Sequence, residues 1–81
     1  MNPSELRVKI VKEVQNKLLS SKDAFLAVYL TMHMNDHGEF FRPSLQTISE
    51  DCSLSVGSVI RRLRRLRDFE FLACIVDEFD V

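Results

Sequence analysis

The chain of 81 residues lacks several features that would point to a particular chemistry. No apolar run approaches the ~20 residues that a membrane-spanning helix needs, and no basic-then-apolar leader begins the chain. Glycine occurs only twice and forms no phosphate-binding loop, and no nucleophile stands in a pattern that would pair it with a base. We therefore expect a cytoplasmic protein that is not an enzyme and that has no membrane partner, no small-molecule substrate and no cofactor.

Cysteine and histidine are also scarce. Cys52 and Cys74 are single and far apart in the sequence, so they lack the spacing of a zinc site or a redox pair. We expect both to be reduced and buried. His33 and His37 are four residues apart, as metal ligands on a helix can be, but Gly38 is predicted to end the helix there. The sequence therefore predicts no metal site.

An excess of positive charge is the third absence. The net charge is −1 and the pI is about 6.1, so the chain lacks the overall signature of a nucleic-acid-binding protein. Local potential matters more than net charge, however, and here the charges are segregated. Five arginines fall within seven positions: Arg61, Arg62, Arg64, Arg65 and Arg67. The acids crowd the end of the chain: Asp68, Glu70, Asp77, Glu78 and Asp80.

The arginines belong to a segment, residues 55–69, that predicts a two-faced helix. Ser55 is a suitable N-cap, and at about 100° per residue the apolar side chains form one stripe. That stripe contains Val56, Val59, Ile60, Leu63 and Leu66. The opposite face contains Gly57, Ser58, Arg61 and Arg65, flanked by Arg62 and Arg64. One face is thus suited to burial and the other to negative charge, although the arginines could instead solvate the helix and pair with Glu50, Asp51 and Asp68.

A second short helix is predicted just before this one, at residues 44–52. Ser44 follows Pro43 as a cap, and a turn of three or four residues with Leu54 buried leads into the next helix. The segment FFRPSLQTISEDCSLSVGSVIRRLRRL resembles the bacterial or phage helix-turn-helix of the winged-helix kind, found in replication initiators and small transcription regulators. The resemblance covers about half of the chain. It implies a mostly α fold with a small β component, containing four helices and a two-stranded sheet.

The chain before this segment predicts two longer helices. Asn2, Pro3 and Glu5 suit the start of a first helix that extends over residues 1–19. Its apolar stripe could pack only within the monomer or could also form a dimer interface, for which we single out Leu6, Ile10, Val14 and Leu18. A second helix, from Lys22 to about Asn35 and capped by Ser20 and Ser21, is apolar on nearly all sides. We expect it to be the central core helix rather than a ligand pocket.

The predicted sheet is small. Residues 39–42 and 71–76 are the two expected strands of a single domain covering residues 1–81. Only eleven residues follow Glu70, without glycine, asparagine or proline, so we expect residues 70–81 to form a truncated wing strand and an acidic tail. Ser53 and Glu70 stand where the family commonly has glycine, so the chain should leave each helix by a less strained path.

The resemblance and the arginine placement together favour binding of double-stranded DNA, as a transcription regulator or replication-associated factor. Arg61 is expected near base edges, and Arg62, Arg64 and Arg65 near phosphates. The predicted DNA-binding residues are Ser44, Gln46, Gly57, Ser58, Arg61, Arg62, Arg64 and Arg65. An alternative is a phage-type accessory protein that binds a host or defence protein through the arginine face or the acidic tail.

Overall fold

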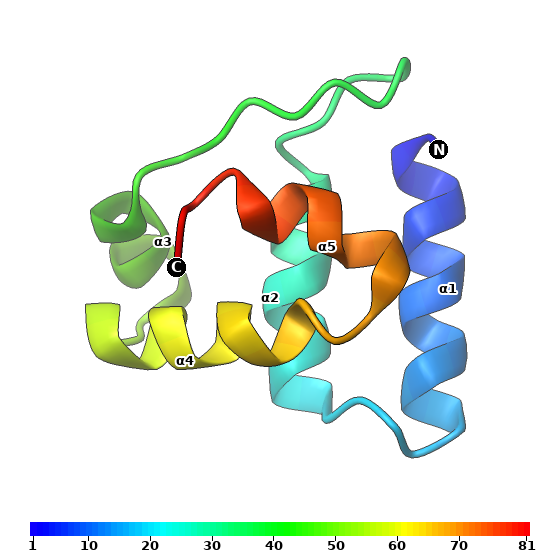
Figure 1. Ribbon diagram of the computed structural model, residues 1–81, viewed down its shortest axis with the longest axis horizontal. Helices are drawn as coiled ribbons and strands as arrows, with labels where there is room; N and C mark the ends of the chain where they lie inside the picture. Colours follow the sequence, from blue (N-terminus) through cyan, green and yellow to red (C-terminus); the bar gives the residue numbers. More distant parts are fainter. The chain divides into compact units, whose positions relative to one another are not determined.

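The computed structural model describes residues 1–81, which contain five α-helices and divide into two compact units, residues 1–41 and residues 42–81 (Figure 1). The first unit contains α1 (Pro3–Gln15) and α2 (Ser21–Thr31). The second contains α3 (Leu45–Cys52), α4 (Val56–Leu66) and α5 (Glu70–Asp77). None of these helices is long and apolar enough to cross a membrane. The single domain over residues 1–81 stays a prediction.

The start of α1 is confirmed and its end is not. The Asn2 side chain accepts a hydrogen bond from the Glu5 N–H at 2.9 Å and donates one to Glu5 Oε1 at 2.8 Å, so cap and third residue satisfy each other. The helix ends at Gln15 rather than at residue 19. The cause is Lys17, whose φ of 62° lies in the left-handed region and whose N–H turns back to bond the carbonyl of Val14.

The α2 helix is capped by Ser20, whose Oγ accepts from the Asp23 N–H at 3.1 Å. Its inner face is fully buried at Leu26 and Leu30. Phe25, however, is 60% exposed, so the prediction of a helix covered on nearly all sides is wrong. An apolar sequence does not by itself supply enough neighbours in an 81-residue chain to cover every face of a helix.

A direct polar link joins α1 to α2. Arg7 Nε donates to Thr31 Oγ1 at 2.9 Å, and the same hydroxyl donates to the Val28 carbonyl at 2.6 Å. Thr31 is completely buried, so these bonds satisfy a hydroxyl that would otherwise be costly to bury.

The expected strand at residues 39–42 is absent. Only an isolated bridge between Met34 and Phe40 forms there. The preceding turn is closed by the Asn35 side chain, which accepts from the N–H groups of His37 and Glu39 at 3.0 Å each. Gly38 adopts a φ of 83° in this turn, as its position predicted.

The second expected strand is a helix, so the predicted fold class is wrong. Residues 71–76 lie within α5, and the chain is all-helical, with five helices and no sheet. The buried residues Leu72, Ile75, Val76 and Phe79 have the i, i+3, i+4, i+7 spacing of a helix face. No strand is present for this segment to pair with, whereas a helix satisfies its own backbone. The truncated wing strand is therefore wrong as well.

Candidate nucleic-acid interface

The α3 helix presents the first two predicted site residues on its exposed side. Ser44 caps the helix: its Oγ accepts from the Thr47 N–H at 3.0 Å and donates to Thr47 Oγ1 at 2.9 Å. Gln46 lies on the first turn and donates to Glu50 Oε1 at 3.0 Å. Ile48 is fully buried on the opposite face. Ser44 and Gln46 are therefore accessible, but their side chains already have partners within α3.

A three-residue turn, Ser53–Leu54–Ser55, connects α3 to α4. Ser53 adopts a φ of 55°, so the expected less strained exit from α3 is wrong. Its N–H bonds the Glu50 carbonyl, and the Leu54 N–H bonds the Ser49 carbonyl at 3.0 Å, which is the Schellman arrangement. The Ser49 hydroxyl also donates to the Leu54 carbonyl at 2.5 Å. This role of Ser49 was not predicted, and its only signal was a small hydroxyl residue five positions before Leu54.

The inner face of α4 is buried in the second unit. Val59, Leu63 and Leu66 have no exposed area, as the helical periodicity predicted. Ser55 begins the helix, with its Oγ accepting from the Ser58 N–H at 3.1 Å. The orientation of α4 is therefore set by a local cap at one end and by buried aliphatic side chains along its length.

The opposite face of α4 is exposed and cationic. The helix contains four arginines and no acidic residue. Arg61, Arg64 and Arg65 are exposed, and Arg62 is half-buried with its Nε 3.3 Å from Ser58 Oγ. Neither Arg61 nor Arg64 makes an ion pair or a hydrogen bond in the structure, so both guanidinium groups are available to a ligand.

Gly57 opens the exposed face at its N-terminal end. A methyl group placed on Gly57 would meet only the Nη1 atom of Arg61, at 3.6 Å. The Arg61 side chain therefore lies back along the helix over Gly57, because helical side chains lean toward the N-terminus. The result is a bare stretch of backbone with a guanidinium group beside it.

Two arginines of the second unit hold the C-terminal segment of the chain. Arg67 Nε lies 3.3 Å from Asp77 Oδ1, and Arg67 Nη2 donates to the Val81 carbonyl. Arg42 Nη1 donates to the Glu78 carbonyl at 2.8 Å. Arg67 is six residues after Arg61 and so lies about 120° from it around the helix axis. The Asp77 carboxylate is therefore paired just after the C-terminal end of α4, whereas Gly57 lies at the N-terminal end of this helix.

The cysteines and histidines do not belong to the arginine face of α4. Cys52 is half-buried, and burial, together with the nearby Asp51 carboxylate, raises the pKa of its thiol. Cys74 is exposed, so the prediction that both cysteines are buried is wrong for it. His33 follows the end of α2 and His37 lies in the next turn, so they do not share one helix face.

The residues predicted for a dimer interface differ sharply in exposure. Leu6 and Ile10 are buried within the chain itself, at 3% and 0% exposed. Val14 is half-buried and Leu18 is 68% exposed. Only the last two could contact a second chain, and the dimer stays a prediction.

Two packed helices joined by a three-residue turn, the second with a buried inner face and an exposed outer face, define a helix-turn-helix. Residues 17–72, more than half of the chain, match the model of a family described as a helix-turn-helix domain, and the chain belongs to this family. The match begins at residue 17, after the end of α1, and finishes at residue 72, within α5. No curated protein and no solved structure matches the chain. The family match does not confirm that this helix-turn-helix is of the winged-helix type.

Proposed function

We propose that the chain binds double-stranded DNA through the exposed face of α4 and acts, without catalytic activity, as a small transcription regulator or replication-associated factor. The observation that carries the proposal is the exposed arginine face on the second helix of the helix-turn-helix, where Arg61 and Arg64 have no partner. Family membership supports it, because in helix-turn-helix proteins the second helix enters the major groove and the first crosses the backbone.

The placement of each residue suggests its part in such a complex. Arg61, near the middle of the exposed face, is the candidate for a two-pronged contact with a guanine edge. Arg62, Arg64 and Arg65 would face phosphates on either side. Gly57 and Ser58, at the start of α4, would let the DNA backbone approach closely. Ser44 and Gln46 would meet a phosphate near the start of α3, where free helix amides favour an anion.

The test is a binding titration with labelled duplex DNA. A pool of random duplexes is first enriched on the protein, and the enriched site and a scrambled one are then compared by fluorescence anisotropy. We expect tighter binding to the enriched site, and the Arg61→Ala variant should lose about 1 to 3 kcal/mol there while losing preference at one base pair. Absence of binding to any duplex at low salt would refute the proposal. A stoichiometric protein partner, with no DNA retained after nuclease treatment, would favour the alternative of a protein-binding module.

A further inference from the structure

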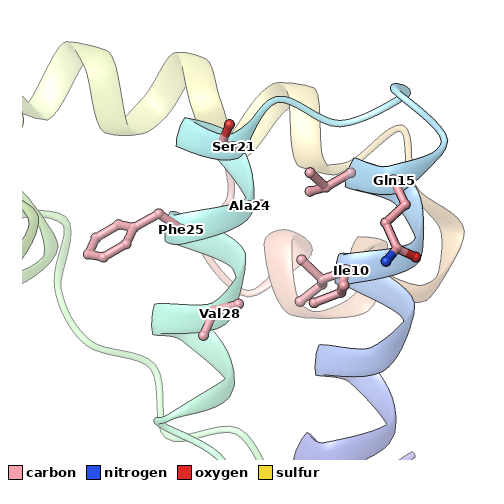
Figure 2. A pocket seen from close by; sticks show the side chains of 8 residues that line it. Ile10, Gln15, Ser21, Ala24, Phe25 and Val28 are labelled. Atoms are coloured by element: carbon pink, nitrogen blue, oxygen red, sulfur yellow. The ribbon is translucent and has the colours of Figure 1, made fainter.

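An apolar groove of about 380 Å³ lies between α1 and α2 of the first unit (Figure 2). Figure 2 shows Ile10 and Gln15 on α1 and Ala24 and Val28 on α2 bordering it. No charged side chain lines this groove, so it offers nothing that would attract or repel a phosphate. The charged contacts that bear on DNA binding lie in the second unit instead, between two arginines and the C-terminal segment, residues 77–81.

One edge of the Arg67 guanidinium group is occupied by the chain itself. Its Nε lies 3.3 Å from Asp77 Oδ1, and its Nη2 donates to the Val81 carbonyl. Nε and Nη2 point along the same edge of the planar group, and this edge can make two parallel hydrogen bonds to a carboxylate or a phosphate. Residues 77–81 therefore fill the edge of Arg67 that a DNA phosphate would otherwise bind in a two-pronged manner.

Arg67 would extend the exposed arginine face of α4 if this edge were free. It follows Arg64 by three residues, and its N–H bonds the Leu63 carbonyl at 3.1 Å as in a continuing helix. The side chains of Arg64 and Arg67 are therefore neighbours on the helix surface. The helix thus ends with two adjacent arginines, of which Arg64 is available to a phosphate and Arg67 is withheld.

The C-terminal segment is fixed in place beside Arg67. Phe79 is only 7% exposed, and it anchors the segment between Asp77 and Val81. Arg42 Nη1 donates to the Glu78 carbonyl at 2.8 Å. Because the segment is already ordered by these contacts, its oxygens occupy Arg67 at little additional cost in conformational entropy.

We propose that residues 77–81 restrain DNA binding by holding Arg67, and that Arg67 becomes a further phosphate contact when the Asp77 carboxylate no longer pairs with it. The proposal rests on DNA binding through α4. The carboxylate is the decisive partner, because a hydrogen bond to an ionised acceptor is about twice as strong as one to a neutral carbonyl such as that of Val81. A phosphate must displace both oxygens to gain the two-pronged contact, so the segment lowers affinity without covering the face around Arg61.

The test compares two variants of the full chain, Asp77→Ala and Glu78→Ala, by fluorescence anisotropy with one duplex over a range of salt concentrations. Both remove one exposed carboxylate from the same segment, but Asp77 is the one paired with Arg67. Asp77→Ala should steepen the slope of log K against log salt concentration by about 0.9, the contribution of one phosphate contact. Between about 50 mM and about 200 mM salt it should lose about 3.5-fold more affinity than the unaltered protein, whereas Glu78→Ala should keep the original slope.

A third variant, Asp77→Ala with Arg67→Gln, assigns the effect to Arg67. It should return the slope to its original value, because the added contact is removed. The ¹⁵N signal of the Arg67 Nε–H group gives a second readout, since addition of duplex should shift it in Asp77→Ala and leave it in place in Glu78→Ala. Cooperative urea unfolding, with midpoints near that of the unaltered protein because the ion pair is exposed, checks that each variant is folded.

Three results would overturn the proposal: Asp77→Ala binds DNA with the original slope, Glu78→Ala steepens the slope equally, or the steeper slope survives Arg67→Gln. Each of them would leave DNA binding through α4 standing. Absence of duplex binding by the unaltered chain and by every variant would instead refute the proposed function, and this proposal with it.

Discussion

The sharpest test of the arginine face is the salt dependence of DNA binding in a double variant, Arg61→Gln with Arg64→Gln. Both side chains are exposed and neither has a partner within the protein. Their replacement should therefore change the free energy of unfolding by no more than about 0.5 kcal/mol. Any loss of DNA affinity would then report the interface itself.

The size of the effect follows from the release of counterions. Each phosphate that an arginine neutralises contributes about 0.9 to the slope of log K against log salt concentration. Arg64 is proposed to meet a phosphate and Arg61 a base edge, so one lost phosphate contact should flatten this slope by about 0.9. Between about 50 mM and about 200 mM salt, the unaltered protein should therefore lose about 3.5-fold more affinity than the variant. If Arg61 contacts a phosphate instead, the difference in slope rises to about 1.8, which corresponds to about 12-fold.

The assay is fluorescence anisotropy with one duplex at five or more salt concentrations, and the matched control is Arg67→Gln. Arg67 is already paired with Asp77, and its side chain is 40% exposed, so it should contribute little to binding. Its replacement should cost at most about 1 kcal/mol of stability, as expected for an exposed ion pair. The reasoning is refuted if the double variant keeps the original slope, or if Arg67→Gln flattens it equally.

Other predictions follow from the turn, the start of α4 and the thiols. Ser53→Gly should raise the free energy of unfolding in urea by up to about 1 kcal/mol, because glycine relieves the cost of the left-handed φ, whereas Ser53→Ala should bring no gain. Gly57→Ala should raise stability by up to about 1 kcal/mol yet weaken DNA binding; equal or tighter binding would show that DNA does not approach this backbone. Cys74 should be alkylated before Cys52 at mildly alkaline pH, followed by mass spectrometry, since the Cys52 pKa is raised above its ordinary value of 9.0. Because the pKa of Cys52 is raised in the folded state, the stability that its thiol contributes is present below pH 9.0 and is lost as the pH rises through the folded pKa. A midpoint of urea unfolding that rises across this pH range would contradict the raised pKa.

The elements that depend on local contacts were predictable. The caps at Asn2, Ser20, Ser44 and Ser55 were all expected, and in the structure each side chain accepts from the backbone N–H three residues later. These bonds need only neighbouring residues, so the helix starts follow from short stretches of sequence. The buried stripe of α4 follows equally from its periodicity.

The helix ends and the sheet were not predictable in the same way. Lys17 and Ser53 adopt left-handed conformations that residues other than glycine rarely take, and the sequence carries no strong signal for them. Residues 71–76 have few polar side chains, so their composition suits either a strand or a buried helix. The spacing of Leu72, Ile75 and Phe79 does indicate a helix, but it extends beyond the six residues from which the strand was predicted.

The sequence by itself determined where four helices begin, which face of residues 56–66 is buried, and that arginines occupy the other face, because these properties depend on residues a few positions apart. Only the tertiary structure decided that residues 70–77 form a helix, that Leu6 and Ile10 are buried within the chain, and that Asp77 pairs with Arg67. The physical reason is that a strand, an exposed surface and an ion pair are each defined by what lies next to them in space, and those neighbours are far away in the chain.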